Sequence, residues 1–212
     1  MKIALFGASG TIGQRILDEA LRRGHTVTAL VRDPSRLTGR GGLQVRAGNV
    51  LDPNSVASAV AGHDAVVSAF GPGAGQDPQT VVQAARALIA GLKAAGVKRL
   101  VVVGGAGSLE VAPGVQLVDT PSFPAAWKPV ALAHRDALNV YRAEGGELDW
   151  TNFSPAALIQ PGERTGKYRL GGDQLVTDAE GQSRISAEDY TVALLDELEK
   201  PRHVRQRFTA AY

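Results

Sequence analysis

Short apolar runs alternate along the chain with longer segments in which apolar residues recur at helical spacing. The apolar and β-branched runs predict six strands, at residues 2–6, 26–31, 43–47, 64–70, 99–103 and 148–153. The segments between them predict helices at residues 12–23, 53–60, 80–95 and 129–144. Continuous apolar strands are typical of a parallel sheet that is buried on both faces. We therefore expect a doubly wound α/β fold with strand order 3-2-1-4-5-6.

Two stretches depart from this alternation. Residues 104–127 have no clear period and contain four glycines and three prolines, which predicts a long loop. In the tail, short polar strands are expected near Tyr168 and Leu175, then a helix over residues 186–199 with a capping-box-like start, and a last strand at 207–209. No repeat or linker divides the chain, so residues 1–212 are expected to form one domain with a small C-terminal, substrate-side portion.

Composition and charge exclude several classes of protein. The 212 residues are 44% hydrophobic, and 23 Lys and Arg against 21 Asp and Glu leave a net charge of +2 without any block of like charges. We therefore expect no nucleic-acid or membrane partner. The chain has no cysteine, which excludes disulfides and thiolate catalysis, and no metal-ligand spacing of histidines and carboxylates. Because the first strand begins at Lys2 and no run reaches the roughly 18 apolar residues of a membrane span, we expect a soluble, cytoplasmic protein.

A glycine-rich turn, Gly7-Ala-Ser-Gly-Thr-Ile-Gly13, joins the first strand to the first helix. The free backbone amides of such a turn and the dipole of the helix attract a pyrophosphate. Gly7 suits the turn off the strand, Gly10 suits close approach of the backbone to a ligand, and Gly13 suits close packing of helix on sheet. The spacing differs from the standard G-x-G-x-x-G, and strand-to-helix turns use glycine even where nothing binds. The position in the first βαβ unit favours a bound dinucleotide.

Arg32 ends the second strand. At this place dinucleotide folds carry an acidic residue for the ribose of NAD or an arginine for the 2′-phosphate of NADP. Ser35 and Arg36 follow at once, so two guanidinium groups and a hydroxyl can surround one phosphate. The alternative is a solvated basic strand end in which Asp33 pairs with Arg32. We expect NADP(H) rather than NAD(H).

Further candidate residues follow the third and fourth strands. Asn49 and Val50 are placed to flank an adenine ring, and Phe70 and Gly71 lie where the chain passes the nicotinamide ribose. Ligands of open α/β sheets bind at the carboxyl ends of strands, which favours this interpretation. Either pair could equally serve only the turn that contains it.

These segments together resemble the atypical short-chain dehydrogenases/reductases of the NmrA-like group, close to flavin reductase/biliverdin reductase B and to NADH-flavin reductases. The resemblance covers essentially the whole chain and rests on Gly7–Gly13, Val31–Arg36, Gly48–Asp52, Leu148–Thr151 with Ser154-Pro155, and Arg184–Tyr190. It implies a Rossmann fold that binds NADP(H). The contacts it implies are Ser9, Gly10, Thr11, Ile12 and Gly13 with the pyrophosphate, Arg32 and Arg36 with the 2′-phosphate, Asn49 and Val50 with the adenine, and Phe70, Gly71, Gly105 and Pro155 with the nicotinamide end.

One feature of the wider superfamily is missing. Its alcohol-handling members use a Tyr-x-x-x-Lys pair, but none of the four tyrosines here has a lysine four residues later, and the segment 104–108 lacks the usual serine just after the fifth strand. Ketone reduction benefits from a placed proton donor by roughly 10²- to 10⁴-fold, whereas a flavin or quinone delocalises the incoming charge. We therefore expect the partner to be a small-molecule acceptor, a flavin or quinone.

His134, on the predicted 129–144 helix, is the one candidate proton donor, because imidazole titrates near neutral pH. The alternative is a surface histidine without a catalytic role. A second hypothesis for the whole protein is a non-catalytic regulator of the NmrA type that senses NADP(H), and a third, weaker one is an epimerase or dehydratase. Both a monomer and a homodimer are compatible with the sequence.

Overall fold

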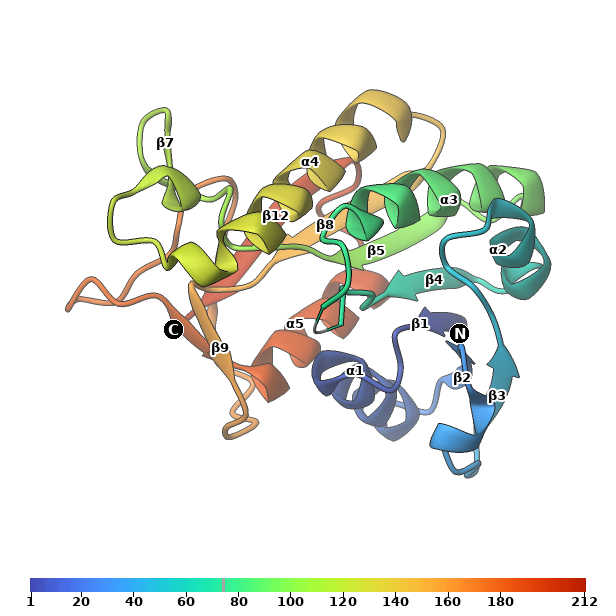
Figure 1. Ribbon diagram of the computed structural model, residues 1–212. Helices are drawn as coiled ribbons and strands as arrows, with labels where there is room; N and C mark the ends of the chain where they lie inside the picture. The colour runs from blue at the N-terminus through green and yellow to red at the C-terminus, as the bar shows by residue number, and fades with distance from the viewer. Residues whose placement is uncertain (74) are drawn as a thin grey trace.

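The computed structural model describes residues 1–73 and 75–212, with Arg36 described by its backbone alone. Its centre is an eight-stranded sheet in the order β10-β12-β8-β5-β4-β1-β2-β3 (Figure 1). All neighbouring strands are parallel except β10 and β12. The strands are β1 (Lys2–Phe6), β2 (Thr26–Val31), β3 (Leu43–Ala47), β4 (Ala65–Ser68), β5 (Arg99–Val103), β8 (Asp149–Ser154), β10 (Arg169–Gly171) and β12 (Gln206–Ala211). The predicted order 3-2-1-4-5-6 is confirmed, with β8 as the sixth strand.

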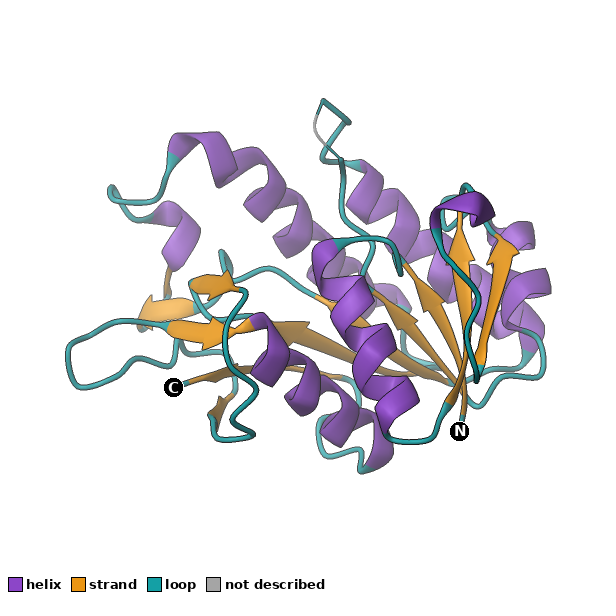
Figure 2. Cartoon of the chain, turned by 90° about the horizontal axis from the view of Figure 1, so that it is seen from below, coloured by secondary structure: helices purple, strands orange, loops and turns teal. Residues whose placement is uncertain are grey.

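Helices cover both faces of the sheet, as the continuous apolar strands predicted. One face carries α2 (Pro53–Val60), α3 (Thr80–Ala95) and α4 (Lys128–Glu144), and the other carries α1 (Thr11–Arg22) and α5 (Ala187–Glu199) (Figure 1). Figure 2, seen from below, shows the second pair crossing in front of the strands. Of the helices that the structure describes, none has the length and apolarity needed to cross a membrane.

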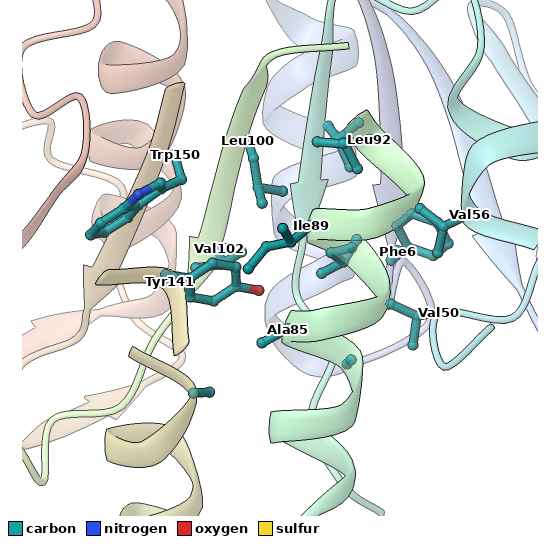
Figure 3. Packing of buried hydrophobic residues seen from close by; sticks show 14 of the residues in the cluster. Phe6, Val50, Val56, Ala85, Ile89, Leu92, Leu100, Val102, Tyr141 and Trp150 are labelled. Atoms are coloured by element: carbon teal, nitrogen blue, oxygen red, sulfur yellow. The ribbon is translucent and has the colours of Figure 1, made fainter. Parts of the chain in front are cut away.

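Each face of the sheet has its own hydrophobic core, because side chains alternate along every strand. In β1, Leu5 packs towards α1 and α5, whereas Phe6 packs towards α2 and α3. Figure 3 shows part of the core on the face that α2, α3 and α4 cover, where α3 contributes Ile89 and Leu92 beside Leu100 of β5. All five side chains are nine-tenths buried or more. The two cores hold the carboxyl ends of the strands in a fixed row.

The segment 104–127 contains more regular structure than the expected loop. It holds a small hairpin of β6 (Glu110–Ala112) and β7 (Val115–Gln116), turned at Gly114 with φ of +74°, and two short 3₁₀ helices, η2 (Leu117–Asp119) and η3 (Ala125–Trp127). Leu109 and Val118 are fully buried and fix the segment to the core. These strands are too short for alternation to reveal them.

The tail also differs in part from the prediction. The strand near Tyr168 is β10, and the last strand is β12, but the strand expected near Leu175 is reduced to an isolated parallel β-bridge between Gln174 and Glu110. The amide of Leu175 donates to the carbonyl of Glu110 at 2.8 Å. A separate parallel pair, β9 (Leu158–Gln160) and β11 (Arg184–Ser186), was not predicted. Helix α5 begins as expected, since the Ser186 hydroxyl accepts from the amide of Asp189 at 2.9 Å.

Candidate functional site

The glycine-rich turn between β1 and α1 has no room for side chains at two of its glycines. Gly7 has φ of +78°, and a Cβ there would lie 2.5 Å from the carbonyl oxygen of Ala69. A Cβ at Gly13 would lie 1.9 Å from the carbonyl oxygen of Gly7. The turn therefore packs directly against the end of β4 and the first turn of α1, as the glycine spacing predicted.

The same turn presents free backbone amides at the amino end of α1. The amide of Gly10 donates to Gly7 at 3.0 Å, and that of Gln14 donates to Gly10 at 2.9 Å. The amides of Thr11 and Ile12 have no acceptor among the described residues, and no side chain caps the helix. A Cβ at Gly10 would meet nothing closer than 3.4 Å, so packing within the protein does not require glycine there. This helix end can bind an anion.

A cleft of about 380 Å³ opens beside the turn, along the carboxyl ends of β1 to β4. Its floor is apolar, because Phe6, Leu30 and Val50 are all nine-tenths buried or more. Its other lining residues include Gly7, Ser9, Gly10, Arg32, Gly48, Asn49, Phe70, Gly71, Gln76, Asp77 and Thr80. The strand order reverses between β1 and β4, which is where open α/β sheets bind their ligands.

Arg32 lies exposed at the end of β2 and lines this cleft, with no ion-pair partner within the described part of the chain. Ser35 is used differently from the prediction. Its hydroxyl donates to Oδ1 of Asp33 at 2.6 Å, so the one proton that it could offer a phosphate is engaged within the turn. The side chain of Arg36 lies outside the described residues, and its predicted role stays a prediction.

The remaining predicted residues are divided between the cleft and the helix. Asn49 closes a local turn, in which its Oδ1 accepts from the amide of Leu51 at 3.1 Å. Phe70 is half-buried and Gly71 exposed, and both line the cleft. Three residues predicted to contact a pyrophosphate form the first turn of α1 rather than the cleft wall, namely Thr11, Ile12 and Gly13.

A second pocket, of about 540 Å³, lies at the carboxyl ends of β5 and β8. It is lined by residues of the 104–127 segment, by the amino half of α4 and by the chain from Pro155 into β9. Gly105 and Pro155, both predicted at the nicotinamide end of a cofactor, line this pocket and not the 380 Å³ cleft. Most of its walls are apolar, from Leu117, Phe123, Pro124, Trp127, Val130, Leu158 and Ile159.

A narrow internal cavity of about 20 Å³ connects the lining of the two larger spaces. Phe70 lines both the cavity and the cleft, and His134 lines both the cavity and the apolar pocket. The three spaces therefore form one row along the carboxyl edge of the sheet. Phe70 and His134 thus stand on the lining between the cleft and the apolar pocket, with only the small cavity between them.

The comparison with protein families decides what kind of ligand this row serves. A family model described as NAD(P)H-binding matches residues 7–201, which include the glycine-rich turn and both large pockets. The chain belongs to this NAD(P)H-binding family.

Three solved structures resemble the chain along nearly its whole length. A Burkholderia pseudomallei protein, named as a candidate exported protein, is 57% identical with a TM-score of 0.92, and each chain is covered completely. A candidate epimerase from Bacteroides thetaiotaomicron is 43% identical with a TM-score of 0.92, over all of this chain and 96% of that one. A candidate NADH-flavin reductase from Streptococcus pneumoniae is 35% identical with a TM-score of 0.88, over 100% and 99%. These relatives of the NAD(P)H-binding protein thus share one fold but have been given different functional names.

The residues present fit the cofactor of the NAD(P)H-binding family. The free amides of α1 match the negative charge of a pyrophosphate, and the apolar floor around Leu30 and Val50 matches an adenine ring. Arg32 stands where the adenine ribose of such a dinucleotide would lie. Around Gly10 the turn leaves open space, which is compatible with close approach of a ligand to its backbone.

His134 lies in the first half of α4. A Cβ placed on Gly105 would lie 2.8 Å from the Cβ of His134. Glycine at 105 thus lets α4 approach the end of β5. Burial lowers the pKa of His134 to about 4, so its ring is neutral at pH 7 and is not the charged acid that an ordinary histidine supplies near neutrality. A neutral imidazole still offers one N–H donor, and neither ring nitrogen has a partner in the described chain.

Two buried polar side chains beside the small cavity were not predicted. Asn152 on β8 and Tyr141 on α4 are 3% and 4% exposed, and neither side chain has a hydrogen-bond partner among the residues described. A Cβ at Gly104 would lie 2.2 Å from Oδ1 of Asn152, so this amide fills the space that a side chain on residue 104 would need. The only sequence signal of this arrangement was the missing serine after the fifth strand. The periodicity of the chain shows which residues face inward, but it does not show which of them lie at a ligand site.

Proposed function

We propose that the protein is an NADP(H)-dependent oxidoreductase that transfers hydride to a planar acceptor, such as a flavin or a quinone, in the cytoplasm. One observation carries the proposal. His134 lines an open apolar pocket and also the small cavity that separates this pocket from the cleft beside the glycine-rich turn. The name of the Streptococcus pneumoniae relative, a candidate NADH-flavin reductase, supports this class of acceptor by similarity.

The choice of NADP(H) rests on Arg32. An exposed guanidinium in the cleft wall, without an ion-pair partner in the described chain, can form charge-assisted hydrogen bonds with a 2′-phosphate. The residue that directly follows β2 is thus an arginine, and the carboxylate next to it, Asp33, accepts from the amide and the hydroxyl of Ser35 through Oδ1.

In the proposed mechanism the bound NADPH supplies the hydride. Gly105 and Pro155 orient the nicotinamide end towards the apolar pocket, whose walls stack the acceptor and exclude water. The neutral ring of His134 donates its N–H to an oxygen or nitrogen of the acceptor and stabilises the charge that arrives with the hydride. Solvent supplies the proton, as a delocalised acceptor permits.

An epimerase, the name given to the Bacteroides thetaiotaomicron relative, fits the pocket less well. Such chemistry needs a placed base to take a proton from the substrate. His134 is the one titratable side chain among the described lining residues, and Tyr141 lies in the small cavity with its pKa raised by burial. The apolar walls favour a flat, weakly polar acceptor instead.

Turnover tests the proposal directly. NADPH oxidation is followed at saturating NADPH with riboflavin, FMN or a naphthoquinone as acceptor, and NADPH binding is measured separately by fluorescence titration. We expect turnover with at least one of these acceptors. Tight NADPH binding without turnover on any of them would contradict the proposal and favour the alternative of a non-catalytic NADP(H) sensor.

The choice of cofactor is tested by Arg32→Asp. We expect this change to weaken NADPH binding by about 10- to 100-fold while leaving NADH binding within about 3-fold, because only NADPH loses a charge-assisted contact. Arg46→Asp, which alters an exposed arginine of β3 outside the cleft by the same charge, is the matched control. Equal losses for both cofactors in the Arg32 variant would overturn the assignment of the 2′-phosphate to Arg32.

A further inference from the structure

The residues that line the apolar pocket restrict the charge of the ligand that it can bind. We propose that this pocket selects uncharged acceptors and discriminates against acceptors that bear a phosphate, sulfonate or carboxylate. The inference rests on the proposed function and narrows its acceptor class, from any planar acceptor to a neutral one.

No Asp, Glu, Lys or Arg is found among the described residues that line the pocket. The only polar side chains there are Ser122 and His134. The walls are otherwise built from glycine, alanine, proline, aliphatic residues and two aromatic residues, Phe123 and Trp127. A pocket of this composition recognises shape and apolar area, and it offers no counter-charge to an anion.

His134 does not supply the missing positive charge. Its pKa is lowered to about 4 because burial disfavours the charged ring, so it stays neutral across the physiological range. As a neutral group it gives one hydrogen bond, which suits a quinone carbonyl or a flavin ring atom. Protonation of His134 to meet an anionic ligand would require the half-buried ring to gain charge at pH 7, against the lowering of its pKa.

An anionic substituent therefore has no favourable place within the pocket. Moving it inside removes its hydration without replacing it by an ion pair, which is strongly unfavourable. It has to remain in water beyond Trp127 and Leu158, which are 61% and 46% exposed at the pocket. The ring system then cannot enter as deeply as that of a neutral acceptor of the same shape.

The neighbouring cleft has the opposite character. Its glycine-rich turn offers free amides, and Arg32 adds a fixed positive charge. The two spaces thus sort their ligands by charge along one edge of the sheet. The anionic cofactor binds beside α1 and β2, and a neutral acceptor binds beside α4 and β8. This arrangement also disfavours a second cofactor molecule in the acceptor pocket.

The test compares a neutral naphthoquinone with its sulfonated analogue, and riboflavin with FMN, at saturating NADPH. We expect kcat/KM to be at least about 10-fold higher for the neutral member of each pair. Because a sulfonate also changes the reduction potential of a quinone, a pair of variants separates binding from reactivity. Ala126→Lys adds a cation at an exposed lining position, and Ala126→Gln adds a neutral polar chain there as the control.

The lysine variant should raise the ratio of kcat/KM for the sulfonated over the neutral quinone by about 3- to 10-fold relative to the glutamine variant. Equal kcat/KM within both acceptor pairs, or a ratio that is the same in the two variants, would overturn the inference while leaving the proposed reductase intact. If NADPH binds but no acceptor is reduced, the proposed function fails and this inference fails with it.

Discussion

Gly13 can carry only a hydrogen atom, because the carbonyl oxygen of Gly7 occupies the position of a side chain. The contact brings the first turn of α1 against the turn that leaves β1, so the free amides of this helix end open towards the cleft. Gly10, three residues earlier, has no such neighbour. At the scale of single residues, packing thus requires glycine at position 13 and does not require it at position 10.

Gly13→Ala should therefore damage both the fold and the site. We expect the free energy of unfolding to fall by about 1–3 kcal/mol, because the new methyl group forces the turn and the helix apart. NADPH affinity should fall with it. Urea unfolding and fluorescence titration measure the two effects. Gly41→Ala, where a Cβ would meet no atom within 4 Å, should stay within about 0.5 kcal/mol of the natural protein. Unchanged stability and affinity in Gly13→Ala would show that the turn adapts.

Single residues also show how much of the candidate site could be predicted from the sequence. The roles of Gly7 and Gly13 in packing follow from their spacing, and Arg32 follows from its place at a strand end. The neutrality of His134 does not, because it depends on how closely α4 packs on β5 at Gly105. Asn152 escaped prediction for the same reason. Local pattern specifies which face a residue occupies, but only tertiary packing specifies its neighbours.

At the scale of elements, the two ends of α1 have different roles. Its amino end faces the cleft, and farther along the helix the buried carboxylate of Glu19 accepts from Arg23 at 2.7 Å and from Arg164 at 2.9 Å. Arg164 belongs to the segment between β9 and β10, far away in the sequence. Burial raises the pKa of Glu19, but the hydrogen bonds from Arg164 and Arg23 outweigh burial and lower it to about 2. This cluster fixes α1 to the C-terminal portion.

The stability of this junction should depend on acid pH. Because the pKa of Glu19 is lower in the folded chain than its ordinary 4.5, its stabilising effect is complete above about pH 4.5 and is lost as pH falls towards 2. Glu19→Gln should cost about 2 kcal/mol at pH 7 and make unfolding less sensitive to pH between 4.5 and 2. Urea unfolding at pH 7, 4 and 3 measures both.

Glu147→Gln is the matched control for this cluster. Glu147 pairs with Lys93 at 3.0 Å on an exposed surface, where an ion pair contributes little. We expect its loss to change the free energy of unfolding by less than about 1 kcal/mol at every pH. If the two variants have the same pH dependence, the Glu19 cluster does not anchor α1 as described.

For the whole molecule, the order of the central strands was predictable, whereas the pairing of the strands at the margin was not. The strands β1, β2, β4 and β5 have apolar runs that are buried on both faces, and this requirement fixes the class of the fold and helps to fix the strand order. By contrast, β9 pairs with β11 across the intervening β10, and β10 joins the sheet antiparallel to β12. Short strands with polar residues carry no comparable signal, because their pairing depends on partners that lie far away in the sequence.

A cofactor bound along this edge touches several strands at once and should stabilise the chain as a unit. At a concentration of 100 times its Kd, NADPH should raise the free energy of unfolding by about 2.7 kcal/mol. This corresponds to a rise in Tm of roughly 5–10 °C for a chain of this size. Differential scanning fluorimetry measures it. Arg32→Asp should show a smaller rise at the same NADPH concentration, and absence of any rise in the natural protein would contradict the cofactor assignment.

The division of the edge into a cleft and a pocket also has a kinetic consequence. Within the described lining, no residue belongs to both spaces, and in the proposed mechanism only the nicotinamide end of the cofactor reaches the acceptor pocket, at Gly105 and Pro155. The chain contains no cysteine, and hence no thiol on which reducing equivalents could wait between two half-reactions. We expect the acceptor to bind and leave in every turnover, so that both ligands are present together when hydride moves. Double-reciprocal plots of initial rate against NADPH, at several acceptor concentrations, should intersect as for a ternary complex rather than run parallel.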